Sequence, residues 1–139
     1  MTFHDSQGLL SAMRFRLVMV VLFNFTLATS VLAMDRWTAL SMIESGGDDK
    51  AVGPGGEISR FQIRHSLWPG GDPQNPQVAL AVAQDIMRPR LEKFLQSHKR
   101  PATDFEFYVL WNAPSHIERP SAAVAERAQR FCNLIKKSP

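Results

Sequence analysis

One glutamate beside a glycine-rich turn has the surroundings that a general acid needs. Glu44 lies near the end of a helix predicted over residues 35–45, within an apolar sector formed by Trp37, Leu40 and Ile43. An apolar environment and a helix C-terminus both disfavour an ionised carboxylate, so the pKa of Glu44 is expected to be raised. A carboxylic acid that stays protonated near neutral pH can serve as the general acid in glycosidic bond cleavage. The alternative is a solvated side chain at a frayed helix end.

The residues that follow Glu44 form two segments with defined spacing. Ser45 comes directly after it, and residues 51–63 read AVGPGGEISRFQI; residues 108–114 read YVLWNAP. In this order they resemble the Glu-Ser pair, the A-x-S-x-x-G-A/E-x-G-L-M-Q-I segment and the A-Y-N-A-G signature of soluble lytic transglycosylases, a family of the lysozyme superfamily. The resemblance covers roughly residues 39–139. The positions that depart from the family pattern are Gly53 for Ser, Ser59 for Gly, Arg60 and Phe61 for Leu-Met, Trp111 for Tyr and Pro114 for Gly.

The resemblance implies a fold, a substrate and a set of site residues. The fold would be mainly α, a small lysozyme-like α+β domain with a short β-like segment beside the catalytic helix. The substrate would be the peptidoglycan glycan strand, cleaved at the β-1,4 bond between N-acetylmuramic acid and N-acetylglucosamine, with Glu44 as the acid. The substrate-binding residues would be Gln62, Trp111 and Asn112, together with Ser45, which would support the turn. Trp111 could equally pack in the core, because aromatic residues are dense in this predicted helix.

The step after protonation has alternatives. A lytic transglycosylase would use the muramic 6-hydroxyl as nucleophile, form 1,6-anhydro ends and need no second carboxylate. A hydrolysing lysozyme on the same scaffold would need one, and Glu57 and Asp48 are the candidates near Glu44 in sequence. Asp48 and Asp49 are expected to cap or solvate a mobile loop, which is a poor support for a nucleophile. A glycan-binding envelope module with weak catalysis is the third alternative.

The first 33 residues predict a secretory signal peptide. A basic start at residues 13–16 precedes the nearly apolar run 17–32, and small residues end at Ala33. Residues 1–12 would then be an extended leader or a misassigned start, with Met13 as the true one. An uncleaved anchor is the rival interpretation. We therefore expect export to the periplasm or cell envelope, a mature domain over residues 34–139, and membrane contact only through the N-terminal segment.

The charge, cysteine and histidine content of the chain limits the kinds of ligand that it is expected to bind. The 139 residues are 45% hydrophobic and carry a net charge of +3, which suits one globular domain, expected to be a monomer. This excess is too small to indicate nucleic-acid binding but suits an anionic wall polymer. Cys132 is the only cysteine, so no internal disulfide is expected. The histidines are scattered, and we expect neither a metal site nor a cofactor.

Three further helices are predicted. Asn75 and Pro76 mark the start of the first, which Pro89 is expected to kink or split. A capping box over residues 103–106 opens the second, and the third begins near Ser121. Residues 57–63 predict a short strand or extended segment. His98, in a polar connector, is expected to be solvated.

Overall fold

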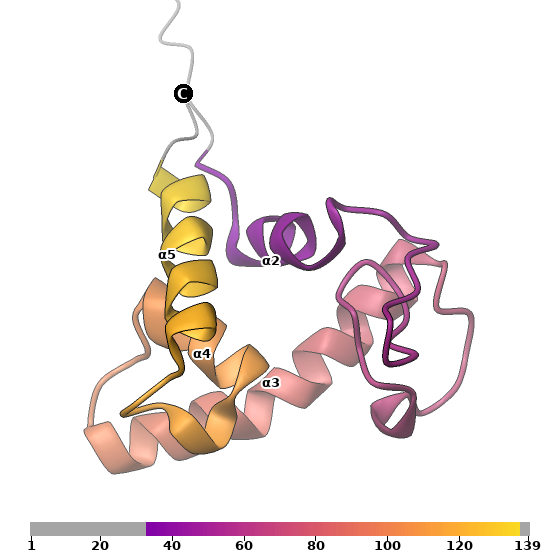
Figure 1. Ribbon diagram of the computed structural model, residues 1–139. Helices are drawn as coiled ribbons and strands as arrows, with labels where there is room; N and C mark the ends of the chain where they lie inside the picture. The colour runs from indigo at the N-terminus through magenta and orange to yellow at the C-terminus, as the bar shows by residue number, and fades with distance from the viewer. Residues whose placement is uncertain (1–32, 137–139) are drawn as a thin grey trace, which may run out of the picture. The chain divides into compact units, whose positions relative to one another are not determined.

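The computed structural model describes residues 33–136, and this part of the chain is mainly α-helical (Figure 1). It contains four α-helices and two short 3-10 helices: α2 (Arg36–Ser45), η2 (His65–Leu67), α3 (Pro76–His98), α4 (Asp104–Asn112), η3 (Pro114–His116) and α5 (Ala122–Lys136). The predicted signal peptide lies, apart from Ala33, outside the described residues. None of the helices described is both long and apolar enough to cross a membrane.

The predicted helix starts are confirmed, and three of the four helices have the expected capping side chain. Asp35 accepts hydrogen bonds from the backbone N–H groups of Trp37 and Thr38, and Asn75 caps α3 in the same way. Thr103 and Glu106 form the predicted capping box of α4, each side chain accepting from the other's backbone N–H. These caps satisfy backbone donors that have no partner within a helix.

Pro89 was expected to kink or split its helix; α3 runs unbroken across this residue, so the split is wrong. Figure 1 shows it extending from the loop region of the domain to the end that carries α4 and α5. Proline removes one backbone hydrogen bond. The buried residues on either side of it, Met87 and Phe94, hold the helix in the core despite that loss.

Helix α4 is the most buried element of the described chain. Its residues 107–110 are all buried, and it packs against α5 and α3. Phe107 stacks on Phe131 of α5 and meets Trp37 of α2 edge to face. Four consecutive buried residues place contacts on every side of this helix, so its C-terminal end is held rigidly.

Residues 57–63 do not form the predicted strand. Two isolated antiparallel bridges, Val52 to Ile58 and Ile58 to Ile63, are the only β pairing in the described residues. The backbone turns back on itself because Ser59 (φ 71°) and Gln62 (φ 48°) take left-handed conformations. The segment is therefore a tight turn, with Phe61 and Ile63 buried in the core.

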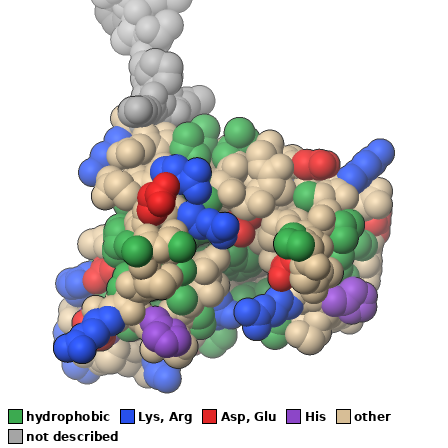
Figure 2. All heavy atoms as spheres, in the orientation of Figure 1, with side chains coloured by type: hydrophobic (Ala, Val, Ile, Leu, Met, Phe, Trp, Pro, Cys, Tyr) green, Lys and Arg blue, Asp and Glu red, His purple; other side chains and the backbone are tan. Residues whose placement is uncertain are grey.

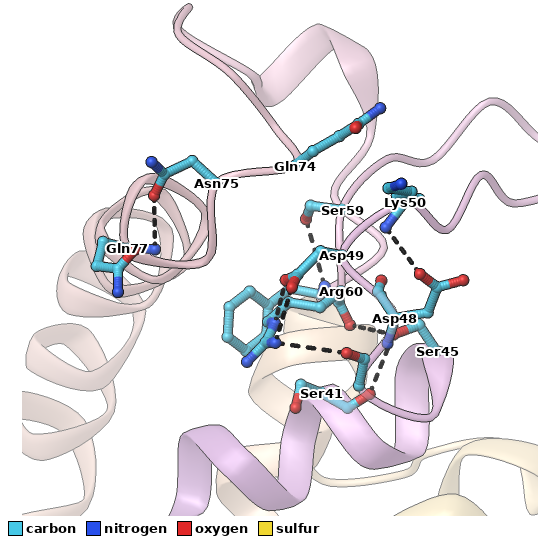
Figure 3. Close-up of polar contacts among 12 residues, drawn as sticks. Ser41, Ser45, Asp48, Asp49, Lys50, Ser59, Arg60, Gln74, Asn75 and Gln77 are labelled. Carbon is cyan, nitrogen blue, oxygen red and sulfur yellow. Dashed lines mark hydrogen bonds and ion pairs between the residues drawn. The ribbon is translucent and has the colours of Figure 1, made fainter.

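The loop after α2 is tied down rather than mobile as predicted (Figure 3). The guanidinium of Arg60 binds both carboxylate oxygens of Asp49, at 2.6 and 3.1 Å. The Ser45 hydroxyl donates to the carbonyl oxygen of Arg60 at 2.8 Å and accepts from the backbone N–H of Asp48. These contacts join the end of α2 to the turn at residues 59–62.

His98 is also not simply solvated. Its ring stacks on Phe94 with 3.9 Å between the centroids, and Nε2 lies 3.0 Å from a carboxylate oxygen of Glu118. The contact with Glu118 joins the end of α3 to the segment that precedes α5.

Candidate functional site

A groove of about 740 Å³ lies where the end of α2, the loop, α3 and the end of α4 meet. This volume is within the usual range for small-molecule sites. Figure 2 shows a hollow on this face, between the side formed by α4 and α5 and the side formed by the loop. The groove is lined by Glu44, Pro54, Glu57, Gln62, Ile63, Arg64, Leu67, Ile86, Arg90, Trp111, Asn112, Ala113, Pro114, Ser115, His116 and Arg127.

Glu44 is half-buried on the groove wall, one residue before the end of α2. Burial raises the pKa of its carboxyl group above the ordinary value, whereas the Tyr108 hydrogen bond and the charge of Arg127 act in the opposite direction. The net shift is upward, in the direction expected from the sequence. The geometry therefore gives Glu44 a larger protonated fraction than an exposed glutamate has at the same pH.

Tyr108 is a site residue that the sequence analysis did not single out. Its hydroxyl donates a hydrogen bond of 2.7 Å to Oε1 of Glu44, while its ring is buried against Phe131. Burial and the neighbouring carboxylate raise the pKa of the Tyr108 hydroxyl, so it remains a donor at neutral pH. The available sequence signal was a tyrosine in an aromatic-rich helix expected to lie in the core, one helical turn before Trp111. A buried tyrosine hydroxyl usually has a hydrogen-bond partner.

Gln62 and Glu57 meet on the loop side of the groove. The Gln62 amide nitrogen donates to the carbonyl oxygen of Ser59 at 3.0 Å, and a carboxylate oxygen of Glu57 accepts from the backbone N–H of Gly55 at 3.0 Å. A Cβ atom added at Gly53 would lie 2.5 Å from side-chain oxygens of both Gln62 and Glu57. The absence of a side chain at Gly53 therefore leaves room for these two polar groups.

The end of α4 forms the opposite wall. Trp111 is half-buried and packs edge to face against Phe61, with 6.4 Å between the centroids, yet it also lines the groove. Asn112 is exposed and lines the groove beside it. Trp111 therefore does both of the things left open for it: it packs against the core and it lines the groove.

Ser45 and Asp48 lie outside the groove lining. Ser45 fastens the loop through the bonds described above, and Asp48 is exposed, with one carboxylate oxygen accepting from the backbone N–H of Lys50. Glu57 is the second carboxylate that shares the groove with Glu44. Residues 33–136 contain no group of three or more His, Cys, Asp or Glu side chains that could hold a metal ion.

Comparisons with protein-family models, with curated proteins and with solved structures found no match for this chain. The resemblance to lytic transglycosylases therefore stays a prediction that rests on the two motif segments. What the structure adds is that Glu44 lines one groove together with Gln62 of the first segment and with Trp111 and Asn112 of the second.

Proposed function

We propose that this protein is a peptidoglycan lytic transglycosylase with a lysozyme-like fold. The observation that carries the proposal is Glu44, a half-buried carboxyl group with a raised pKa, held by the Tyr108 hydroxyl in a groove large enough for a glycan. A raised pKa suits a general acid, and a neighbouring donor fixes the direction of its oxygen atoms. Gln62, Asn112 and the Trp111 ring offer the amide and aromatic groups that bind sugars.

In the proposed reaction the Glu44 proton passes to the glycosidic oxygen that links N-acetylmuramic acid to N-acetylglucosamine. The bond from C1 of the muramic residue to that oxygen breaks, and the N-acetylglucosamine leaves with a free 4-hydroxyl group. The oxygen of the muramic 6-hydroxyl group then bonds to C1. The Glu44 carboxylate takes the proton of that hydroxyl group, which restores the acid. An internal nucleophile is already held near C1, so the step avoids the entropy cost of bringing in a water molecule.

Hydrolysis is the second candidate, and Glu57 is the residue that favours it. It is a carboxylate in the same groove as Glu44, and its side chain is oriented by the backbone N–H of Gly55. A hydrolase needs a second carboxylate to act as nucleophile or to activate water. Asp49 is less suited to this role because the ion pair with Arg60 already engages both of its oxygens.

Digestion of purified peptidoglycan separates these candidates. We expect the wild-type protein to release fragments whose muramic ends resist borohydride reduction, as 1,6-anhydro ends do. Glu44→Gln should remove nearly all activity, because the amide keeps the shape but has no proton to transfer. Glu57→Gln is the matched control and should retain most activity. Full activity in Glu44→Gln would refute the proposal, and reducible ends lost in Glu57→Gln would establish hydrolysis.

The proposed site of action is the periplasm or cell envelope, where peptidoglycan lies. This part of the proposal depends on the signal-peptide pattern of residues 1–33.

A further inference from the structure

Two arginine side chains on the groove have no acidic partner within residues 33–136. Arg64 follows the tight turn at residues 59–62, and Arg90 lies on α3. The ion pairs of the described chain involve other basic residues, namely Arg36, Arg60, Arg88, His98 and Arg100. Arg127, the third arginine of the groove, acts on Glu44, whose pKa it lowers. Arg64 and Arg90 are therefore groove arginines that form no ion pair with any residue from 33 to 136.

Arg90 is held in a fixed position. Its Nη1 donates to the carbonyl oxygens of Leu110 and Trp111 at 2.9 and 2.8 Å, at the C-terminal end of α4. Nε and Nη2 make no hydrogen bond to any residue from 33 to 136, and every buried side-chain nitrogen or oxygen in that part of the chain has a partner. These two donors therefore reach solvent. A guanidinium group anchored at one nitrogen is preorganised to bind a ligand with the others.

Arg64 contributes a second positive charge to the same groove. Burial, together with the charge of Arg64, lowers the pKa of Arg90, which means that the two guanidinium groups repel each other. Arg64 is exposed and makes no side-chain hydrogen bond to any described residue. Two like charges beside one groove create a local positive potential that an anion relieves.

We propose that Arg64 and Arg90 form a subsite for a carboxylate carried by the bound glycan, namely that of the lactyl arm of N-acetylmuramic acid or of the peptide attached to it. This inference rests on the proposed function, because it assumes that a peptidoglycan strand lies across Glu44. Guanidinium groups bind planar carboxylates through paired N–H donors. N-acetylglucosamine is uncharged, so a carboxylate subsite would distinguish peptidoglycan from a neutral glycan such as chitin.

The test measures binding in the Glu44→Gln chain, where cleavage does not interfere. Three ligands are compared by calorimetry: a GlcNAc–MurNAc tetrasaccharide with free lactyl carboxylates, the same glycan with peptide stems, and chitotetraose. We expect the best carboxylate-bearing ligand to bind about tenfold tighter than chitotetraose, as for one charge-assisted contact. A preference for free lactyl groups or for peptide stems identifies which carboxylate is bound.

Arg64→Gln should bring this affinity ratio close to one, and Arg64→Lys should restore part of it. Arg130→Gln is the matched control, because Arg130 is exposed and outside the groove lining, and it should leave the ratio unchanged. Thermal melts of the variants check that each is folded. A ratio near one in the Glu44→Gln chain, or a ratio that survives Arg64→Gln, would overturn the subsite alone. Failure to bind any of the three glycans would overturn the proposed function and the subsite with it.

Discussion

Replacing Tyr108 by Phe removes one hydroxyl group and leaves the buried ring against Phe131. The lost contact is the 2.7 Å hydrogen bond to Oε1 of Glu44. A hydrogen bond to a neutral acceptor contributes about 0.5–1.5 kcal/mol to folding, and one to a charged acceptor about 1.5–3 kcal/mol. We therefore expect Tyr108→Phe to lower the free energy of unfolding by about 1 kcal/mol when Glu44 is protonated and by about 2 kcal/mol when it is ionised.

The pH dependence follows from the sign of the Glu44 shift. A carboxyl group whose pKa is raised in the folded protein stabilises the fold below its ordinary pKa of 4.5 and loses that contribution as the pH rises through the raised value. The Tyr108 hydrogen bond lowers the pKa of Glu44, so its removal raises that pKa further. The loss of stability with rising pH should therefore be larger in Tyr108→Phe than in the wild type, and any alkaline fall in cleavage should move to higher pH.

Urea denaturation of both proteins between about pH 4 and pH 8 measures these differences directly. For a domain of this size each kcal/mol corresponds to a change in Tm of about 4–8 °C, so thermal melts give an independent check. A double-mutant cycle isolates the interaction between Tyr108 and Glu44. It combines Tyr108→Phe with Glu44→Leu, whose side chain has no hydrogen-bond acceptor, and should give a coupling energy of about 1 kcal/mol or more. Equal destabilisation at both pH values with no coupling would show that Tyr108 does not act on the ionisation of Glu44.

Two further predictions concern the turn at residues 59–62. Arg60→Gln breaks a partly buried, two-point ion pair with Asp49 and should lower the free energy of unfolding by about 1–3 kcal/mol in urea denaturation. The control Arg88→Gln, which breaks an exposed ion pair, should lower it by less than about 1 kcal/mol. Equal losses in the two variants would contradict the role of Arg60 in holding the loop. Ser59→Val puts a β-branched residue at a buried position with φ 71° and should lower the free energy of unfolding by about 2 kcal/mol or more. Ser59→Gly should stay within about 1 kcal/mol of the wild type. A Val variant as stable as the wild type would argue against the left-handed turn.

Helix boundaries were predictable because their causes are local. The Asp35 cap, the pair of Asn75 with Pro76, and the capping box of Thr103 each satisfy backbone groups within a few residues, and the structure contains all of them. The continuity of α3 across Pro89 was not predictable in this way. Its cost is offset by burial against elements that are distant in sequence, and a local pattern carries no information about such contacts.

The turn at residues 57–63 shows where sequence patterns stop being informative. Its apolar residues suggested a strand, but Ser59 and Gln62 adopt left-handed backbone conformations that an extended segment excludes. The ion pair between Arg60 and Asp49 holds that turn against the loop, and charged residues alone do not reveal their partners. The left-handed conformations explain the absent strand, and the ion pair explains why the loop is held in place.

The sequence predicted several of the residues that line the groove, but it did not predict the hydrogen bond between Tyr108 and Glu44. Glu44, Gln62, Trp111 and Asn112 were expected from two motifs, and they line one groove. The hydrogen bond from Tyr108 spans 64 positions in the sequence and depends on how α4 packs beside α2. Aromatic density marked this helix as core, while the position of its hydroxyl group depends on tertiary packing that propensity does not describe.

The opposing influences on Glu44 bear on the proposed chemistry. Burial raises the pKa of Glu44, which keeps the group protonated before the first step and makes its carboxylate a better proton acceptor in the second. Tyr108 and Arg127 act in the opposite direction by stabilising the carboxylate, which makes the protonated group a better proton donor in the first step. A group that gives up a proton and takes one back works best when neither form is strongly favoured. Both kinds of influence act on Glu44, and the balance between them sets how readily the group gives up its proton and takes one back in the proposed reaction.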